Sequence, residues 1–142
     1  MPTITADLTE GTAVRISTDT HSWVGDEPVE LGGSDLGPTP YELLLGALAA
    51  CTCITVRLYC DRKGWSLDSV SARFTYDRVH ADDCLESEKE DGGCLDRVQS
   101  DVFIEGDFDD EAKERLREVA ARCPVHKTLE RGVDIVDQIV VG

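Results

Sequence analysis

The sequence predicts one α+β domain covering residues 1–142, on three observations. Strand-like alternation of apolar and polar residues occurs in the first third of the chain and again after its middle. A long apolar helical segment separates these two regions, and a shorter amphipathic helix follows them. There is no internal repeat, low-complexity tract or linker that divides the chain. A chain of 142 residues should bury about 68% of the surface that its unfolded form exposes, so its core needs no disulfides.

The first third of the chain has the period-two pattern of β-strands. Apolar residues alternate with polar ones on both sides of a turn at Glu10 and Gly11: Ile4, Ala6, Leu8, Val14 and Ile16. A passage rich in Gly and Pro follows at residues 31–40 and has the composition of a loop. We therefore expect strands and then a loop before the first helix.

A long apolar helix is expected from about Thr39 to about Lys63. Thr39 is a suitable N-cap, with Pro40 at the first helical position and Glu42 three residues after the cap, which together form a capping box. Gly64 then ends the helix. Because the first half of this segment is apolar on all sides, we expect the helix to be buried on most of its faces.

Two more strands are expected after this helix. The first has alternating apolar residues on one face: Val70, Ala72, Phe74 and Tyr76. The second runs from about Asp96 to Glu105 and ends at Gly106. The acidic segment between them, residues 81–93, is expected to be a surface loop.

Two helices and a final strand complete the prediction. Asp109 is the candidate N-cap of an amphipathic helix, which must end by Cys123 because Pro124 disfavours helical backbone in the residue before it. The same proline can open a second, short helix that continues to Glu130. A last strand is expected near the end of the chain, with its apolar residues at Val133, Ile135 and Ile139.

The chain is strongly acidic, with 29 Asp and Glu against 14 Lys and Arg and a formal net charge of −15. Such a surface repels nucleic-acid phosphates and anionic lipid heads, so we expect no nucleic-acid partner and no membrane partner. No run of about 18 uninterrupted apolar residues is present, and residues 1–7 lack the basic start and apolar core of a signal peptide. We therefore expect a cytoplasmic protein, whose acidity reflects either adaptation to concentrated salt or ordinary solubility.

The chain contains six cysteines and no Cys-x-x-Cys pair: Cys51, Cys53, Cys60, Cys84, Cys94 and Cys123. In cytoplasmic proteins such thiols are more often reactive or metal-binding than part of a disulfide framework. His80, Cys84 and Cys94 offer soft ligands, but only these three are present and their spacing is irregular for a zinc site. We expect no metal site.

Cys51 and Cys123 stand in the most informative contexts. Cys123 is the expected N-cap of the short helix, where unpaired backbone N–H groups favour a thiolate, although a small buried residue at a helix junction would fit as well. Cys51 lies in the middle of the long helix, on the face opposite Cys53 and Cys60, and is either a core residue or a reactive thiol. From the residues alone, both alternatives stay open.

Three stretches of the sequence resemble the OsmC/Ohr family. The first is residues 37–52, GPTPYELLLGALAACT; the second is Arg62–Trp65 with the later Val79–Asp82; the third is residues 123–129, CPVHKTL, preceded by Glu105–Asp109. Together they cover the chain from about Gly32 to Leu129. The joint occurrence of Ala-Ala-Cys and Cys-Pro-Val-His at this separation makes the resemblance specific.

The resemblance implies an intertwined homodimer in which long central helices are packed between antiparallel sheets. It also implies a thiol-dependent peroxidase that reduces organic hydroperoxides, and in some members hydrogen peroxide. Carried over, Cys51 attacks the peroxide and Cys123 resolves the resulting sulfenic acid as a disulfide. The implied partners are a small hydrophobic peroxide and an external thiol or dithiol reductant, with no metal or organic cofactor.

The family's activating residues match less closely. In its best-studied branch a carboxylate directly after the proline at the start of the helix pairs with an N-terminal arginine beside the reactive thiol. Here that position is Tyr41, and Glu42 follows it. Glu42 is therefore our third candidate catalytic residue, with a capping carboxylate as its alternative, and Arg15 is a further candidate for the cation that activates Cys51.

Other interpretations of the same residues stay open. His126, three residues after Cys123, is a candidate for proton transfer or for capping and packing. The chain could also act on another electrophile or thiol partner, or serve as a non-enzymatic dimer that binds a ligand or a metal.

Overall fold

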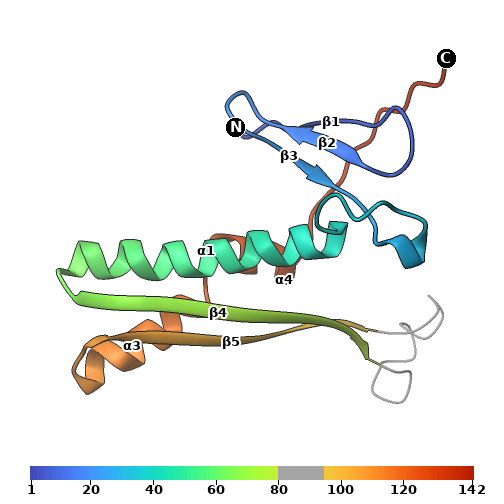
Figure 1. The fold of residues 1–142 in the computed structure, drawn as a ribbon. Coiled ribbons are helices and arrows are strands. Elements are labelled where there is room, and N and C mark those ends of the chain that lie inside the picture. Colours follow the sequence, from blue (N-terminus) through green and yellow to red (C-terminus); the bar gives the residue numbers. More distant parts are fainter. Residues whose placement is uncertain (80–94) are drawn as a thin grey trace. The chain divides into compact units, whose positions relative to one another are not determined.

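In a computed structural model, the chain has the mixed helix and antiparallel sheet architecture that the sequence predicts, described for residues 1–79 and 95–142 (Figure 1). The chain forms two compact units, residues 1–46 and 47–142. The boundary between them lies inside the long helix α1. The expectation of a single domain stays a prediction.

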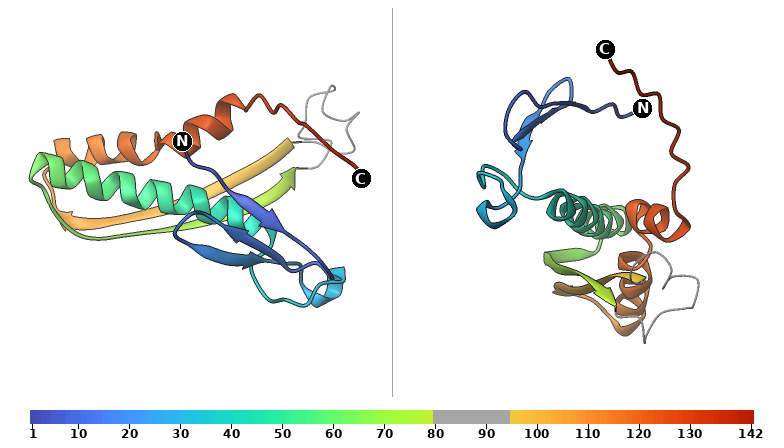
Figure 2. Two further views of the ribbon diagram at one scale, coloured as in Figure 1. Left: turned by 90° about the horizontal axis from the view of Figure 1, so that it is seen from above. Right: turned by 90° about the vertical axis from the view of Figure 1, so that its right-hand side faces the viewer.

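The first unit contains a three-stranded antiparallel sheet in the order β1-β2-β3. Its strands are β1 (Thr5–Asp7), β2 (Val14–Ser17) and β3 (Ser22–Gly25), drawn in blue in Figure 2. The first two strands lie in the region where the sequence predicts them. The third was not predicted, because its two apolar residues are adjacent rather than alternating. A 3₁₀-helical turn, η1 (Val29–Leu31), follows β3 and ends at Leu31, where the expected loop begins.

A buried carboxylate organises this loop. Asp26 is only 2% exposed, and it accepts hydrogen bonds from the Thr12 hydroxyl at 2.6 Å and from the backbone N–H groups of Glu27 at 2.7 Å, Ser34 at 3.3 Å and Leu36 at 3.1 Å. These donors favour the charged form, so the pKa of Asp26 lies below its ordinary value, with the Thr12 hydroxyl as the largest cause. The ionised carboxylate thus holds the loop that leads into α1.

We expect Asp26→Asn to lower the melting temperature at pH 7 by roughly 5 °C or more, because the amide cannot accept all four hydrogen bonds. A lowered pKa stabilises the folded state above about pH 4, and this contribution is lost as the pH falls through the pKa of the folded state. The variant should therefore lose less stability than the wild type on acidification to pH 3. Thermal unfolding by circular dichroism at both pH values tests this, with the exposed Asp19→Asn as control. Equal melting temperatures at pH 7 would contradict the assignment.

The long helix α1 (Pro40–Lys63) begins and ends where the sequence predicts. The N–H of Thr39 donates to the Glu42 carboxylate at 3.2 Å, and the N–H of Glu42 donates to the Thr39 hydroxyl at 3.2 Å, which confirms the capping box. At the other end Gly64 has φ of +72°, the left-handed conformation that terminates helices.

The burial predicted for the first half of α1 is wrong for the chain on its own. Of residues 43–50 only Leu48 is buried, and farther along Ile54 and Leu58 are 57% and 62% exposed. Residues 43–50 are apolar on all sides of the helix, but the described residues of one chain cover only part of this surface.

By length and composition alone, α1 is long and apolar enough to cross a membrane. The expectation that the sequence lacks such a segment is therefore wrong on these two criteria. The core helices of soluble proteins meet the same criteria, so this finding is weak support for a membrane span.

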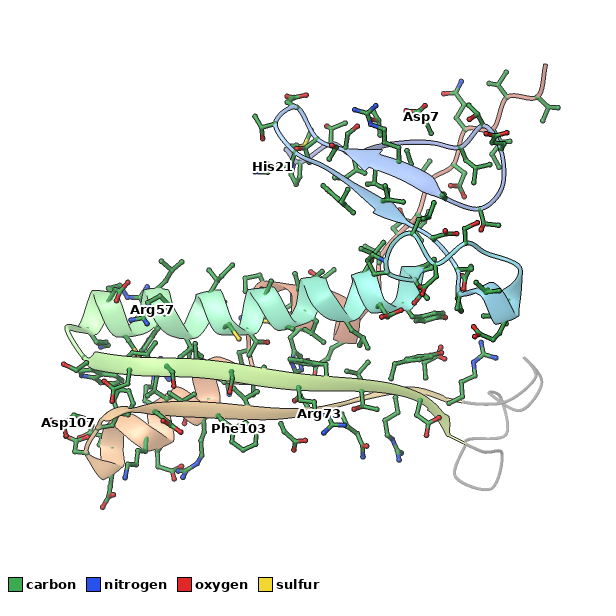
Figure 3. All side chains as sticks on the ribbon, viewed as in Figure 1. Asp7, His21, Arg57, Arg73, Phe103 and Asp107 are labelled. Carbon is green, nitrogen blue, oxygen red and sulfur yellow. The ribbon has the colours of Figure 1, made fainter. Side chains whose placement is uncertain are left out.

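The second unit is built on a long antiparallel hairpin of β4 (Ser66–Val79) and β5 (Leu95–Asp107), paired along its length with one irregularity between Leu67 and Ser69. The predicted alternation is confirmed: Val70, Ala72, Phe74 and Tyr76 are all partly buried, and the residues between them are exposed. Arg73 and Phe103 lie on the face of the hairpin turned away from α1 (Figure 3).

Two helices follow the hairpin. Asp109 caps α3 (Asp110–Ala120) by accepting the N–H of Ala112 at 2.7 Å, and α4 (Pro124–Arg131) opens at the proline as predicted. The buried core of this unit joins the C-terminal half of α1 to β4 and α3 through Val56, Tyr59, Cys60, Leu67 and Leu116. The site described below lies at the start of α4, which runs beside α1 (Figure 2).

The predicted last strand does not form. Residues after Gly132 have no regular secondary structure, and Val133, Ile135 and Ile139 are exposed. A strand needs a neighbouring strand for its backbone hydrogen bonds, and the described residues of this chain offer this segment none.

Candidate functional site

The site is built around Cys123 at the start of α4. Cys123 is the N-cap residue, as predicted, and its Sγ accepts the backbone N–H of His126 at 3.4 Å. Pro124 occupies the first helical position, where its missing N–H costs nothing. Cys123 is completely buried, so its sulfur faces the positive end of the α4 dipole without water around it.

Cys51 meets the same turn of α4 from α1. Its Sγ accepts the backbone N–H of Val125 at 3.5 Å and lies 4.0 Å from the Thr55 hydroxyl, one helical turn farther along α1. Cys51 is partly buried. The structure therefore brings together the two cysteines that the sequence singles out, 72 positions apart, at successive N–H groups of one helix terminus.

Thr52 lies between the two helices and was not singled out by the sequence analysis. It is 1% exposed; its hydroxyl donates to the Leu48 carbonyl at 3.0 Å and lies 3.6 Å from the Sγ of Cys123. A hydroxyl group in the mainly apolar middle of the helix was the available signal. Its significance depends on the proximity of α4, which the local sequence does not contain.

This arrangement suits thiol chemistry. Both cysteines are free thiols, and each sulfur accepts one N–H from the first turn of α4. Backbone N–H groups and the positive end of a helix dipole stabilise a thiolate, the reactive form of cysteine. Two thiols at one helix terminus can therefore supply both an attacking and a resolving sulfur.

A hollow of about 260 Å³ lies near the Cys123 sulfur, although neither cysteine lines it. Its lining includes the two residues that contact that sulfur, Thr52 and His126, and it is otherwise mainly apolar: Phe74, Val102, Ile104, Ala120 and Ala121, with Ser100 and Arg117. Larger hollows, of about 710 and 500 Å³, are lined by other parts of the second unit and by neither cysteine. The hollow of about 260 Å³ is linked to Cys123 through Thr52 and His126.

The other predicted site residues are placed as follows. The Glu42 carboxylate serves the capping box at the start of α1, and Arg15 lies on β2; both belong to the first unit, so their catalytic roles stay predictions. The ring Nε2 of His126 lies 3.0 Å from the Glu130 carboxylate, so the contact that His126 makes with Cys123 is through its backbone.

The remaining cysteines separate into three cases. Cys60 is buried in the core, and desolvation raises the pKa of its thiol, with Asp61 adding to the shift and Arg57 opposing it. Cys53 is partly buried on α1. Cys84 and Cys94, with His80, lie outside the described residues. Among residues 1–79 and 95–142, no three His, Cys, Asp or Glu side chains gather in a way that could hold a metal ion.

Comparisons with known proteins agree with this fold. A family model described as OsmC-like protein matches residues 32–136. The structure is similar to an OsmC-like protein from Mycoplasma pneumoniae, with 26% identity and a TM-score of 0.71 over 92% of this chain and 87% of that chain. It is also similar to the organic hydroperoxide resistance protein OsmC from Legionella pneumophila, with 21% identity and a TM-score of 0.63 over 91% and 88%.

A third similar structure is the organic hydroperoxide resistance protein OhrB of Bacillus subtilis, with 20% identity and a TM-score of 0.58 over 94% of this chain and 93% of that chain. A comparison with curated proteins gave no match. At these identities the last two structures support the fold and not a shared substrate.

Proposed function

The chain belongs to the OsmC-like protein family, and from this premise we propose that it is a thiol-dependent peroxidase that reduces organic hydroperoxides. The single observation that carries the proposal is the convergence of Cys51 and Cys123 on the first turn of α4. Two similar structures are named organic hydroperoxide resistance proteins, so organic hydroperoxides are the substrates to test first.

In the proposed reaction the Cys51 thiolate attacks the terminal oxygen of the hydroperoxide. An S–O bond forms, the O–O bond breaks, and the alkoxide takes up a proton and leaves as an alcohol, so that Cys51 becomes a sulfenic acid. Cys123 then attacks the Cys51 sulfur, and hydroxide leaves as water after protonation. The resulting disulfide is reduced by two external thiols, or by one dithiol, through thiol–disulfide exchange.

The surroundings of Cys51 favour an apolar substrate. The exposed part of α1 around this thiol is apolar, with Leu44, Ile54 and Leu58 at the surface of the chain. In the proposed homodimer this face meets the partner chain, so the alkyl part of an organic hydroperoxide would enter between apolar surfaces, whereas hydrogen peroxide gains nothing from them. We expect the enzyme to work as a cytoplasmic homodimer without a metal or organic cofactor, and Glu42 stays a candidate for activating Cys51.

A peroxide consumption assay tests the proposal. Reduced protein with excess dithiothreitol should consume cumene hydroperoxide catalytically, and faster than hydrogen peroxide. The Cys53→Ser variant is a matched control, because Cys53 lies on the same helix but contacts neither Cys123 nor α4 through a described hydrogen bond. If the wild type consumes neither peroxide above the rate of dithiothreitol alone, the proposal is wrong and action on another electrophile becomes the better interpretation.

A further inference from the structure

Each sulfur of the pair has two polar neighbours of the same kinds. Cys51 has the Val125 N–H at 3.5 Å and the Thr55 hydroxyl at 4.0 Å, and Cys123 has the His126 N–H at 3.4 Å and the Thr52 hydroxyl at 3.6 Å. The N–H groups come from the backbone of one helix, and both hydroxyls come from the other helix. Only the hydroxyls can be removed by a substitution.

We propose that Thr52 is a positioning residue for Cys123, and that its hydroxyl sets how readily this thiol attacks the sulfur of Cys51. The inference deepens the proposed function and rests on it only in taking Cys51 and Cys123 as the reacting pair. Thr52 is suited to this role because it is buried and fixed in the middle of α1. Among residues 1–79 and 95–142, it also makes the only side-chain hydrogen bond described for the Cys123 sulfur.

The hydroxyl can serve both protonation states of the thiol. In the arrangement observed, it donates to the Leu48 carbonyl, so a lone pair of its oxygen is left to accept the S–H of Cys123. When Cys123 loses its proton, the hydroxyl can rotate and donate to the thiolate, while the Leu48 carbonyl keeps its helical N–H partner.

The hydrogen bond from the Thr52 hydroxyl to the Cys123 thiolate is stronger than the bond from the Cys123 S–H to the hydroxyl. Bonds to a charged acceptor are roughly twice as strong as neutral ones, and S–H is a weak donor. The hydroxyl therefore favours the thiolate of Cys123 over its thiol. The hydroxyl should also stabilise the Cys123 thiolate when Cys123 is the leaving group during reduction of the disulfide.

The attack of Cys123 can be measured without any peroxide. The disulfide reagent DTNB converts the Cys51 thiolate to a mixed disulfide and releases one thionitrobenzoate. Cys123 then attacks the Cys51 sulfur, forms the protein disulfide and releases a second thionitrobenzoate. The two releases are two phases in a stopped-flow absorbance trace, and peptide mapping identifies the bond formed. The assay uses a protein with the substitutions Cys53→Ser, Cys84→Ser and Cys94→Ser, which remove competing thiols. Cys60 is kept because it is buried.

We expect Thr52→Val, which keeps the shape of the side chain, to slow the second phase by roughly three- to tenfold, the range that corresponds to one hydrogen bond, and to leave the first phase unchanged. Thr52→Ser should restore the second phase. Thr55→Val, one turn away, should slow the first phase and not the second. If Thr52→Val only disturbed the packing of the site, both phases would slow together, and Thr52→Ser would not restore the second phase.

Either of two results would overturn the inference: an unchanged second phase in Thr52→Val, or an equal effect of Thr55→Val on that phase. The DTNB result is also independent of the proposed function. If the wild type reduces no peroxide but the two threonine variants separate the two phases as described, the peroxidase proposal fails and the role of Thr52 stands.

Discussion

One equivalent of an organic hydroperoxide should convert the reduced protein to a form with a Cys51–Cys123 disulfide, which dithiothreitol reverses. The two sulfurs accept the N–H groups of neighbouring residues, Val125 and His126, at the start of one helix, so an oxidised Cys51 has a second thiol close by. Non-reducing peptide mapping before and after dithiothreitol tests this prediction.

Replacement of Cys51 and replacement of Cys123 should block different steps of the reaction. Cys51→Ser should abolish peroxide turnover and disulfide formation, because it removes the attacking sulfur. Cys123→Ser should reduce one equivalent of peroxide and then stall, with Cys51 as sulfenic or sulfinic acid, which intact mass spectrometry and a sulfenic-acid probe distinguish. A dominant Cys84–Cys94 bridge with Cys51 still reduced would overturn the assignment.

The folded protein should be an obligate homodimer with a large apolar interface. On α1 alone, Leu44, Ile54 and Leu58 are 40%, 57% and 62% exposed, and the segment after Gly132 adds further exposed apolar side chains. Monomeric proteins rarely expose large apolar patches. Because only the dimer would be folded, we expect the melting temperature to rise with protein concentration and light scattering to give twice the mass of the chain.

A charge on the exposed face of α1 gives a sharper test of assembly. Leu58→Glu places a carboxylate in the proposed interface and should lower the melting temperature by roughly 10 °C or more, most strongly at low concentration. Ser71→Glu, on the exposed face of β4, is the control and should have little effect. If light scattering shows that the wild type is a folded monomer at micromolar concentration, the prediction of an obligate dimer is wrong.

Features with a local cause could be predicted from the sequence. The capping box of Thr39 and Glu42, the cap at Asp109 and the helix start at Pro124 each depend on residues within a few positions of one another. The structure confirms all three. The strand β4 was equally accessible, because its alternation of apolar and polar residues continues over many residues, whereas its pairing with β5 was not predicted.

Features with a distant cause could not be predicted in this way. The burial expected along α1 and the strand expected at Val133–Ile139 both need neighbours that the described residues of one chain lack. At the site, the sequence identified Cys51 and Cys123 but not the N–H of Val125 that contacts the first sulfur, because any residue type supplies a backbone N–H. Thr52 was missed for a related reason: its partner on the other helix lies 71 positions away.

The shared use of α4 has a consequence for how such a site can diverge. Both sulfurs depend on the backbone of the same turn, so any shift of α4 changes the environment of the attacking and the resolving thiol together. The threonines on α1, in contrast, each contact one sulfur. Selection for faster attack by Cys51 or slower resolution by Cys123 would therefore act on the side chains of α1, because a substitution there can alter one step alone. The backbone at the start of α4 would stay unchanged, because both steps depend on it.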